Sequence, residues 1–475
     1  MSAPSTAPAR SRWLGLALIA AAQFVVIMDT SIIGVALPGM QADLGFTPES
    51  LSWVFNAYVV AFGGLLLLGG RLSDLLGARK VFISGWLILA AGSVLAGAAG
   101  TVAMEITGRA VQGAGAALVA PAALSLLMAL FGGTNELPRA FAVYGAAAPI
   151  GGTAGVFLGG VLTEYASWPW VFYITVPIAA LVVLLTPGAL PGIAGGRGSV
   201  DVGGAITGTV GLAALVYGVV RAPEAGWAAA ETLVAISGGV VLLAAFFIIQ
   251  ARSRQPLLRL AIFRTPLLGA ANLAQLLLGA AWVPMWFFLN LYLQQVLGAG
   301  AFAAGAALLP MTVLIVLGMT LLAPRLLARF GARALIVAGF GFLAAGLVWL
   351  AFARPDGTYV VDVLPASLVA AFGMALAFVP SLGTAIGAAR PEETGVASGL
   401  VNTSYQIGSA VGLAALTVLS STVAAGSVEP EALTGGYSAA FVGAAAVAAL
   451  GGVITLAALR TRQGTKTAEP ERVAG

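Results

Sequence analysis

Long apolar runs, separated by short polar or glycine-rich segments, make up almost the whole chain. About 20 mostly apolar residues, within a range of about 17 to 25, are needed for a helix to cross the hydrocarbon core of a bilayer. Counted in this way, the pattern predicts fourteen membrane-spanning helices. They cover residues 14–37, 51–70, 80–99, 104–127, 141–162, 168–187, 203–220, 232–250, 267–293, 301–323, 334–353, 363–387, 401–423 and 438–459.

Composition agrees with a protein that is largely embedded in lipid. Hydrophobic residues make up 60% of the 475 residues, charged residues make up only 8%, and the mean hydropathy is +1.01. We therefore expect an all-α integral membrane protein. The chain has no cysteine and no histidine, which excludes disulfides, thiol catalysis and histidine-based metal sites. We expect no metal ion, no cofactor and no enzymatic activity.

Lys and Arg are distributed unevenly between the two sets of loops. With a cytoplasmic N-terminus, the 22 basic residues divide into 19 on the inner side, Arg221 and Arg354 on the outer side, and Arg109 within a span. This excess follows the positive-inside rule and predicts that both termini are cytoplasmic. Because the charges are spread over short loops, the pI of 9.6 does not indicate a nucleic-acid partner.

Two pairs of segments suggest that the chain contains an internal repeat. Residues 69–82 match 323–336 at a spacing of 254, and 150–155 match 407–412 at a spacing of 257. Repeated halves around a central pathway are common in secondary transporters. We therefore expect two six-helix pseudo-repeat bundles with an inserted helix pair. The predicted parts are a cytoplasmic tail (1–13), a first bundle (14–187), a linker with two extra helices (188–266), a second bundle (267–459) and a second cytoplasmic tail (460–475).

Asp29 is an ionisable residue inside the first apolar run. A charge at this depth costs on the order of 3 kcal/mol or more, so a functional role is expected. Arg109 in the fourth span lies at a similar depth, within roughly 3 Å along the helix axis. The two residues are predicted to face a shared cavity, where Asp29 takes up and releases a proton; the alternative is a static ion pair. Other carboxylates near outer span ends are expected to be solvated: Glu105, Glu164 and Asp362.

Four motifs in a fixed order resemble those of the major facilitator superfamily, and within it the fourteen-span drug:proton antiporters. Three differences from the family pattern are Gly34 where Asn is common, Leu75 in place of a frequent Arg, and Val156 where Pro is usual. The resemblance implies a transporter that works by alternating access. The motifs are DTSIIGVALP (29–38), GRLSDLLGARK (70–80), RAVQGAG (109–115) and GVFLGG (155–160), and stretches 168–172 and 395–406 are also similar.

The loop motif between the second and third spans is expected to work as a conformational latch. The carboxylate of Asp74 could pair with Arg79 or cap a neighbouring helix terminus in one state only. The alternative is a solvated tight loop that turns at Gly77. The resemblance also assigns Gly70 and Lys80 to this latch.

Glycines recur every four residues on the fifth span, at Gly151, Gly155 and Gly159, followed by Gly160. Without side chains, they allow a second helix to approach closely. We expect this stripe to slide during transport or to seal against proton leak. The alternative is ordinary packing of small residues.

The second half carries no charged residue well inside a span, so a neutral substrate cavity of amides and aromatic rings is expected there. The alternative is hydrogen bonding between helices together with lipid-facing aromatic rings. The predicted lining residues are Asn272, Gln275, Trp282, Trp286, Asn402 and Gln406, with Asn56, Tyr58 and Gln112 from the first half.

No phosphate-binding loop is present, because neither of the two lysines, Lys80 and Lys466, follows a Gly-x4-Gly pattern. A proton gradient is therefore the expected driving force. The sequence predicts a monomeric efflux antiporter for small hydrophobic or cationic drugs, antibiotics included; a proton symporter for a small metabolite and a lipid-handling protein are the alternatives. Twenty arginines against two lysines suggest a GC-rich bacterial genome and hence a bacterial plasma membrane.

Overall fold

The computed structural model describes residues 9–47, 50–132, 134–192, 195, 201–253, 256–257, 260, 266–388 and 394–458. All regular secondary structure in these residues is helical, as the apolar pattern predicts. The first elements are α1 (Ala9–Leu44), η1 (Ser50–Ser52), α2 (Trp53–Leu76), α3 (Ala78–Gly97), α4 (Val102–Phe131), α5 (Leu137–Tyr165), α6 (Trp170–Tyr173) and α7 (Thr175–Ala189). We refer to α1–α7 as the N-terminal group.

Two further helices, α8 (Val202–Ala225) and α9 (Ala230–Arg252), lead to the second part of the chain. We refer to α10–α15, with their short helical turns, as the C-terminal group. Its elements are α10 (Pro266–Leu291), η3 (Tyr292–Val296), α11 (Ala301–Leu317), η4 (Gly318–Leu322), α12 (Ala323–Leu350), η5 (Tyr359–Val363), α13 (Leu364–Ala388), α14 (Thr394–Ala424) and α15 (Pro430–Ala458).

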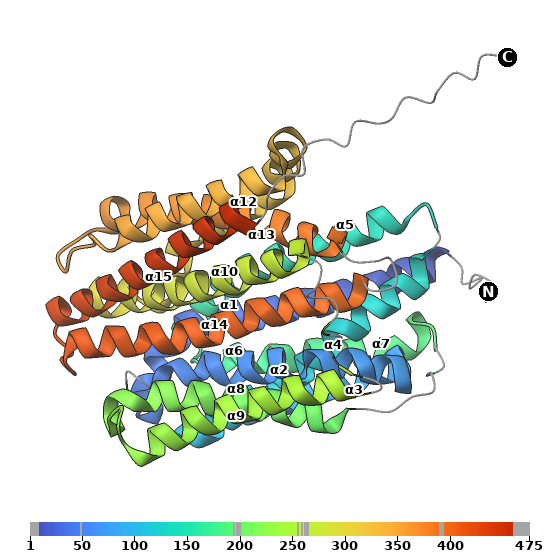
Figure 1. Ribbon diagram of the computed structural model, residues 1–475, viewed down its shortest axis with the longest axis horizontal. Helices are drawn as coiled ribbons and strands as arrows, with labels where there is room; N and C mark the ends of the chain where they lie inside the picture. Colours follow the sequence, from blue (N-terminus) through green and yellow to red (C-terminus); the bar gives the residue numbers. More distant parts are fainter. Residues whose placement is uncertain are drawn as a thin grey trace.

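The helices lie roughly side by side along one direction (Figure 1). Within the described residues, 13 helical stretches are long and apolar enough to cross a membrane. One of them, Ala301–Leu350, runs for 50 residues, which is far longer than a bilayer needs. It is interrupted at Gly331, whose φ of 77° is not helical.

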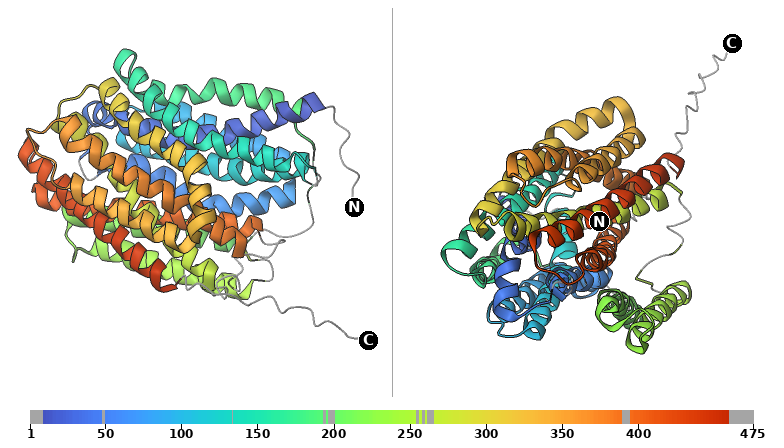
Figure 2. Two further views of the ribbon diagram at one scale, coloured as in Figure 1. Left: turned by 90° about the horizontal axis from the view of Figure 1, so that it is seen from above. Right: turned by 90° about the vertical axis from the view of Figure 1, so that its left-hand side faces the viewer.

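Packing within each group follows the same scheme. In the N-terminal group, α1 packs on α5, and α4 packs on both α2 and α3. In the C-terminal group, α10 packs on α14, and α13 packs on both α11 and α12. The two groups meet where α5 contacts α11 and where α2 contacts α14. The end-on view in Figure 2 shows the blue and teal helices gathered beside the yellow to red ones.

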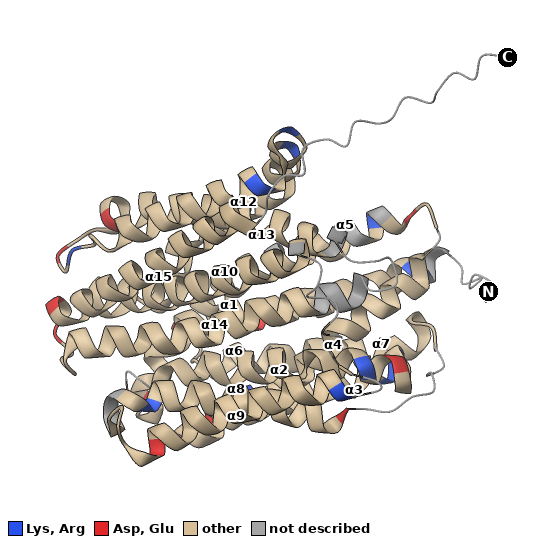
Figure 3. Cartoon of the chain, in the orientation of Figure 1, with Lys and Arg blue, Asp and Glu red and all other residues tan. Residues whose placement is uncertain are grey.

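The α8–α9 pair lies at the edge of the assembly, as the end-on view in Figure 2 shows. Its exposed surface is apolar: Val234 is 69% exposed and Val241 is 65% exposed. Charged residues lie mainly near helix ends, and the middle of the helices is almost free of them (Figure 3). An apolar surface of this extent is stable only against lipid, so the chain is a multi-pass membrane protein.

Candidate functional site

An ion pair joins α1 to α4 in the interior of the N-terminal group. Arg109 Nη1 donates to Asp29 Oδ2 at 2.8 Å, and neither side chain is exposed. The structure thus brings together the acid and the base that the sequence places deep within spans. Whether this pair carries protons stays a prediction at this point.

Gln112 completes the polar contacts of Asp29. Its Nε2 donates to Asp29 Oδ1 at 3.1 Å and to Ser93 Oγ of α3 at 2.8 Å, while its Oε1 accepts from Arg109 Nη1 at 2.7 Å. Gln112 was expected in the substrate cavity; in this structure it is fully buried, and both atoms of its amide are used inside the charge cluster. Because Gln112 lies three residues after Arg109, one face of α4 provides both partners of Asp29.

Arg109 is held from two further sides. Its Nε donates to the carbonyl oxygen of Val54 at 2.8 Å. Its guanidinium carbon lies 4.5 Å from the ring centroid of Tyr58 and 5.8 Å from that of Phe172. The remaining nitrogen, Nη2, is buried and has no hydrogen-bond partner among the described residues. Tyr58 therefore contributes an aromatic face to the buried cation, a cation–π arrangement that strengthens when water is excluded.

Glycines on the neighbouring helices allow this close assembly. A Cβ atom at Gly92 of α3 would collide with the backbone of Gln112, and one at Gly113 of α4 would collide with the backbone of Tyr58. At Gly108, a Cβ atom would lie 2.6 Å from the backbone nitrogen of Ala96. Small residues at these crossings bring α2, α3 and α4 close enough for short side chains to meet.

The energetics of the pair make it costly to remove either partner. Burying two charges costs several kcal/mol per ion, and their mutual attraction offsets this only with good geometry. Removing one partner of a buried pair typically costs about 3–5 kcal/mol, because the other charge is left uncompensated. Protonation of Asp29 removes its charge and therefore weakens its bond to Arg109. A proton at this position thus acts directly on the contact between α1 and α4.

The prediction that the carboxylates near outer span ends are solvated is confirmed for Glu164, which is exposed, and wrong for the other two. Asp362 is only 7% exposed and accepts hydrogen bonds from Arg354 Nε at 2.9 Å and Nη2 at 3.1 Å. Glu105 is 0% exposed, and neither of its oxygens has a hydrogen-bond partner among the described residues.

The burial of Glu105 follows from where α4 begins. Thr101 caps the helix by accepting a hydrogen bond from the Met104 backbone nitrogen at 3.2 Å, so Glu105 falls inside the first turn and not in a loop. It lies four residues before Arg109 and therefore on the same helix face. This spacing is visible in the sequence and could have indicated that Glu105 belongs to the buried charge cluster.

Some of the neutral residues predicted to form a substrate cavity make hydrogen bonds between helices; their role in binding stays a prediction. Gln275 Nε2 donates to Ser381 Oγ at 2.8 Å, and Asn272 Oδ1 accepts from Ser404 Oγ at 2.9 Å. These contacts join α10 to α13 and α14. The other predicted lining residues lie apart: Asn56 is buried beside Ser52, Asn402 is exposed, and Gln406 lies against Gly63 of α2.

Trp286 takes part in the contact between the two groups of helices. It is 9% exposed, like Trp282, and its ring lies directly against the backbone of Gly34, where a Cβ atom would collide with it. The same hypothetical Cβ atom would lie 2.8 Å from Asn290 Nδ2. Beyond this point, Gln295 Nε2 donates to Gln41 Oε1 at 2.8 Å. The end of α1 is therefore closed against α10 and η3, and Gly34 makes room for the closure.

The glycine stripe on α5 faces α1. Cβ atoms at Gly151, Gly155 and Gly159 would all approach the backbone of α1, between Phe24 and Ile32. The next residue, Gly160, instead faces the C-terminal group, where a Cβ atom would lie 2.9 Å from the Cα atom of Phe302. The stripe thus packs against the helix that carries Asp29; whether it slides or seals stays a prediction.

The loop between α2 and α3 turns at Gly77, whose φ of 91° favours glycine. Arg79 donates to the carbonyl oxygens of Leu190 at 3.2 Å and Pro187 at 3.5 Å, and so ties the start of α3 to the end of α7. Asp74 is exposed, and no ion pair to Arg79 is present in this state. Gly70 lies beside Pro121, and Lys80 is exposed. The latch role of the loop stays a prediction.

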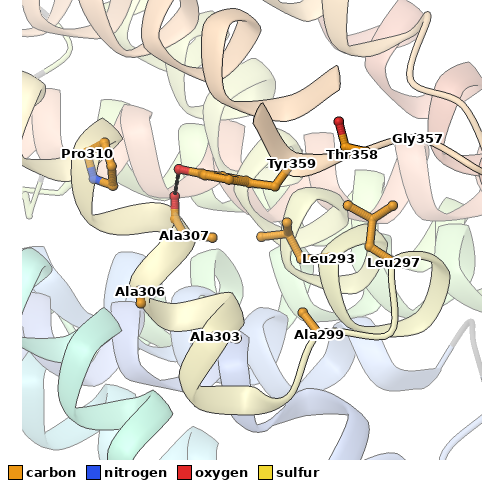
Figure 4. Close-up of a pocket in the computed structure, with 10 residues that line it drawn as sticks. All are labelled: Leu293, Leu297, Ala299, Ala303, Ala306, Ala307, Pro310, Gly357, Thr358 and Tyr359. Carbon is orange, nitrogen blue, oxygen red and sulfur yellow. Dashed lines mark hydrogen bonds between the residues drawn. The ribbon is translucent and has the colours of Figure 1, made fainter. Parts of the chain in front are cut away.

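Among the pockets of the described part of the chain, two open on its surface away from the buried ion pair. One, of about 640 Å³, lies between η3, α11 and η5; its lining is mainly apolar, and Tyr359 crosses it to donate to the Ala307 carbonyl oxygen at 2.7 Å (Figure 4). The other, of about 500 Å³, is an apolar groove between α2 and α8. Neither is lined by the residues predicted to bind substrate. Among the described residues, no cluster of acidic side chains suits a metal ion.

Comparison with known proteins gives one family across most of the chain. A sequence model of the Major Facilitator Superfamily matches residues 19–413. The cephamycin export protein CmcT of Amycolatopsis lactamdurans is 40% identical over 464 residues, which cover 96% of this chain and 95% of that protein. The puromycin resistance protein pur8 of Streptomyces alboniger is 38% identical over 423 residues, with 88% and 84% covered.

Solved structures show the same fold at low sequence identity. An auto-inhibited POT family peptide transporter superposes with a TM-score of 0.68 at 17% identity, covering 97% of this chain and 99% of that one. A mutant of the nucleoside transporter NupG superposes with a TM-score of 0.65 at 16% identity, covering 94% and 100%. At these identities the likeness establishes the helical arrangement alone.

Proposed function

The chain belongs to the major facilitator superfamily, and from this premise we propose that it exports drug-like antibiotics in exchange for protons. As a member of this family it is a membrane transporter and not an enzyme. Its relatives are named for cephamycin export, for puromycin resistance, and for tetracenomycin C resistance and export. Small hydrophobic or cationic molecules of this kind are the proposed substrates, and a single chain is the proposed working unit.

The proposed topology has fourteen spans, with both termini in the cytoplasm of a bacterial cell. The 50-residue stretch Ala301–Leu350 then counts as two spans that meet at the break at Gly331. The inner loops of this arrangement carry most of the Lys and Arg residues, as the positive-inside rule requires. The proposed units are a first bundle (14–187), a linker with an inserted pair (188–266) and a second bundle (267–459), between tails 1–13 and 460–475.

Matching contacts in the two groups support this repeat. Gly77 and Gly331, at equivalent positions of the repeated segment, both have positive φ, 91° and 77°. Two residues later, Arg79 donates to carbonyl oxygens at the end of α7, and Arg333 Nη2 donates to the Leu456 carbonyl oxygen near the end of α15 at 2.6 Å. Each loop therefore holds the last helix of its own group, which suits two bundles that rock as units.

The buried Asp29–Arg109–Gln112 cluster is the observation that carries the proposal. An ionised Asp29 holds α1 to α4 through Arg109 and Gln112. A proton that reaches Asp29 removes the charge that Arg109 and Gln112 bind, so α1 becomes free to move against α4. Because α1 also closes against α10, this change alters the equilibrium between two arrangements of the bundles. The inward proton gradient then drives substrate outward.

We assign the other predicted sites supporting roles in the proposed transport cycle. We assign close sliding contact or sealing to the stripe of Gly151, Gly155 and Gly159, since it packs on the helix that carries Asp29. We assign the latch to the α2–α3 loop, with Asp74 forming its pair or cap in the opposite state. The amides of α10 and α14 line the substrate path once the bundles separate.

Proton movement in vesicles tests this function. Inside-out membrane vesicles with an acidic interior are offered puromycin, a cephamycin, a cationic dye or a sugar, and the internal pH is recorded. We expect a puromycin- or dye-dependent rise in internal pH for the wild type. Asp29→Asn abolishes it, because the amide cannot exchange a proton. Glu164→Gln, which alters an exposed acid, leaves it unchanged.

Three results would contradict the proposal. Proton movement that the sugar alone elicits points to a metabolite symporter. Drug-dependent proton movement that survives Asp29→Asn removes Asp29 from the coupling step. An absence of proton movement with every compound, in vesicles that contain normal amounts of the protein, excludes proton-coupled export of these drug classes.

A further inference from the structure

Glu105 is a second buried acid in the same part of the molecule. It is 0% exposed, and neither carboxylate oxygen has a hydrogen-bond partner among the described residues. An ionised carboxylate that is buried without hydrogen-bond partners is strongly disfavoured, and a bound proton removes this cost. The first turn of α4 favours negative charge through the helix dipole, but this effect is small beside the loss of hydration. The surroundings of Glu105 therefore favour its protonated form.

Two charged groups belong to the same buried cluster as Glu105. One is Arg109, one helical turn along α4, and the other is Asp29 of α1, which pairs with Arg109. Tyr58 of α2, whose ring lies beside Arg109, is a further titratable side chain in contact with the cluster. The remaining charged groups on the helices packed against α4 lie toward helix ends: Arg10, Arg12, Asp43, Arg71, Asp74, Arg79, Lys80, Arg139 and Glu164.

Arg109 has an unused donor within this cluster. Its Nη1 and Nε are bound to Asp29, Gln112 and the Val54 carbonyl oxygen, whereas Nη2 is buried without a partner among the described residues. An unpartnered cation nitrogen and an unpartnered acid, one turn apart on the same helix face, form an incomplete pair. Buried polar groups are normally satisfied, so the arrangement indicates a second state in which this pair forms.

We propose that Glu105 is the outer station of a proton relay in which Arg109 changes its acidic partner between Glu105 and Asp29. This inference rests on the proposed proton-coupled function. In the state seen here, Glu105 holds the proton and Arg109 pairs with ionised Asp29. In the other state, the proton has passed to Asp29, and Arg109 pairs with ionised Glu105.

The transfer between the two acids conserves the charge of the cluster. One proton and one arginine serve two carboxylates, so the cluster is neutral before and after this transfer, and only the release to inner water and the uptake from outer water change its charge by one. Glu105 lies nearer to the start of α4, which is the outer end in the proposed topology. A proton therefore enters from outer water onto Glu105, passes to Asp29, and leaves from Asp29 to inner water, as substrate moves the other way.

Infrared spectroscopy of the purified wild-type protein tests the resting protonation state without any substrate. We expect a carbonyl-stretch band from a protonated carboxyl group whose proton exchanges only slowly with the solvent. Glu105→Gln removes this band, and Glu164→Gln, which changes an exposed acid, keeps it. A band that survives Glu105→Gln, or a wild type without such a band, overturns the proposal.

Transport assays test the relay itself. Glu105→Gln has the shape of the protonated acid, so a merely structural Glu105 predicts normal transport. The relay predicts that gradient-driven puromycin export is lost, whereas exchange of puromycin for puromycin without a gradient is kept. Glu105→Asp recovers part of the driven export. Unchanged driven export, or equal loss of export and exchange, overturns the relay.

The two proposals fail in distinguishable ways. If the wild type moves no protons with any drug, the antiport function fails, while the infrared band still reports whether Glu105 is protonated. If drug-dependent proton movement is present and depends on Asp29 but not on Glu105, the antiport function stands and the relay is wrong.

Discussion

Gly34 and Trp286 meet where the N-terminal group of helices closes against the C-terminal group. One substitution at this contact should therefore weaken the closed state. The family motif that residues 29–38 resemble commonly has Asn at position 34. Gly34→Asn adds a Cβ atom that collides with the Trp286 ring and lies 2.8 Å from Asn290 Nδ2. Overpacking of this kind typically costs about 1–3 kcal/mol. Because the cost falls only on the closed state, it shifts the equilibrium toward the state open at this end by roughly 5- to 150-fold.

The absence of cysteine from the chain makes this shift easy to measure. A single Gln41→Cys reports on the closed end, since the Gln41 side chain is half-buried against Gln295. We expect Gly34→Asn to raise the rate at which a membrane-impermeant maleimide labels this cysteine. A cysteine at Val428, which is 76% exposed, serves as the control whose labelling stays constant.

A double-mutant cycle separates the collision from other effects of the asparagine. In a Trp286→Ala background the collision with the ring is absent and only the contact with Asn290 remains, so adding Gly34→Asn should raise the labelling rate of the Gln41→Cys reporter much less. An equal rise in both backgrounds would refute the reasoning, and so would no rise in the wild-type background.

Three further substitutions test the interior and the loop. Asp29→Asn removes the partner that Arg109 has in the state seen here and should lower the unfolding temperature of the purified protein. The cost should be smaller than the about 3–5 kcal/mol of an uncompensated buried charge, because Glu105 can pair with Arg109 instead. Asp29→Asn combined with Arg109→Gln should recover part of the loss, and no recovery would argue against the pair as the cause. Gly155→Leu places a Cβ atom 2.8 Å from the Met28 carbonyl oxygen of α1 and should abolish drug export, whereas the Cβ atom of Gly145→Leu on the same helix meets no atom within 4 Å, so this variant should keep export. Asp74→Asn should reduce export at normal membrane abundance, and full activity would exclude the latch.

The apolar pattern predicts the helical membrane fold but not the helix ends. It places the first span at 14–37, whereas α1 extends from Ala9 to Leu44 and carries the polar Gln41 and Asp43 beyond the apolar run. The pattern records which residues suit hydrocarbon, and a helix continues past that region wherever its backbone bonds are maintained. The same limitation explains the wrong expectation for Glu105, which lies in the first turn of α4 near the span boundary.

The buried charge cluster is partly visible in the sequence. Asp29 and Arg109 lie at similar depth within apolar runs, so each is a natural partner for the other, and Gln112 shares a helix face with Arg109. The contact of Gly34 with Trp286 joins residues that are far apart in the chain and depends on how two helices cross. The spacing of residues along the sequence does not encode how two helices cross. For the same reason, the sequence alone does not determine how the predicted cavity residues lie relative to one another.

One helix connects the proposed proton site with the contact that closes the two groups of helices. Asp29 on α1 binds Arg109 of α4, and five residues later Gly34 on the same helix meets Trp286 of α10. Five residues of helix span about 7.5 Å, a distance over which an α-helix transmits a displacement with little bending. The glycine stripe of α5 packs closely along this segment of α1. A change of charge at Asp29 therefore acts at close range on the contact that closes the two groups, and labelling of the Gln41→Cys reporter should rise in the Asp29→Asn protein if the two are coupled.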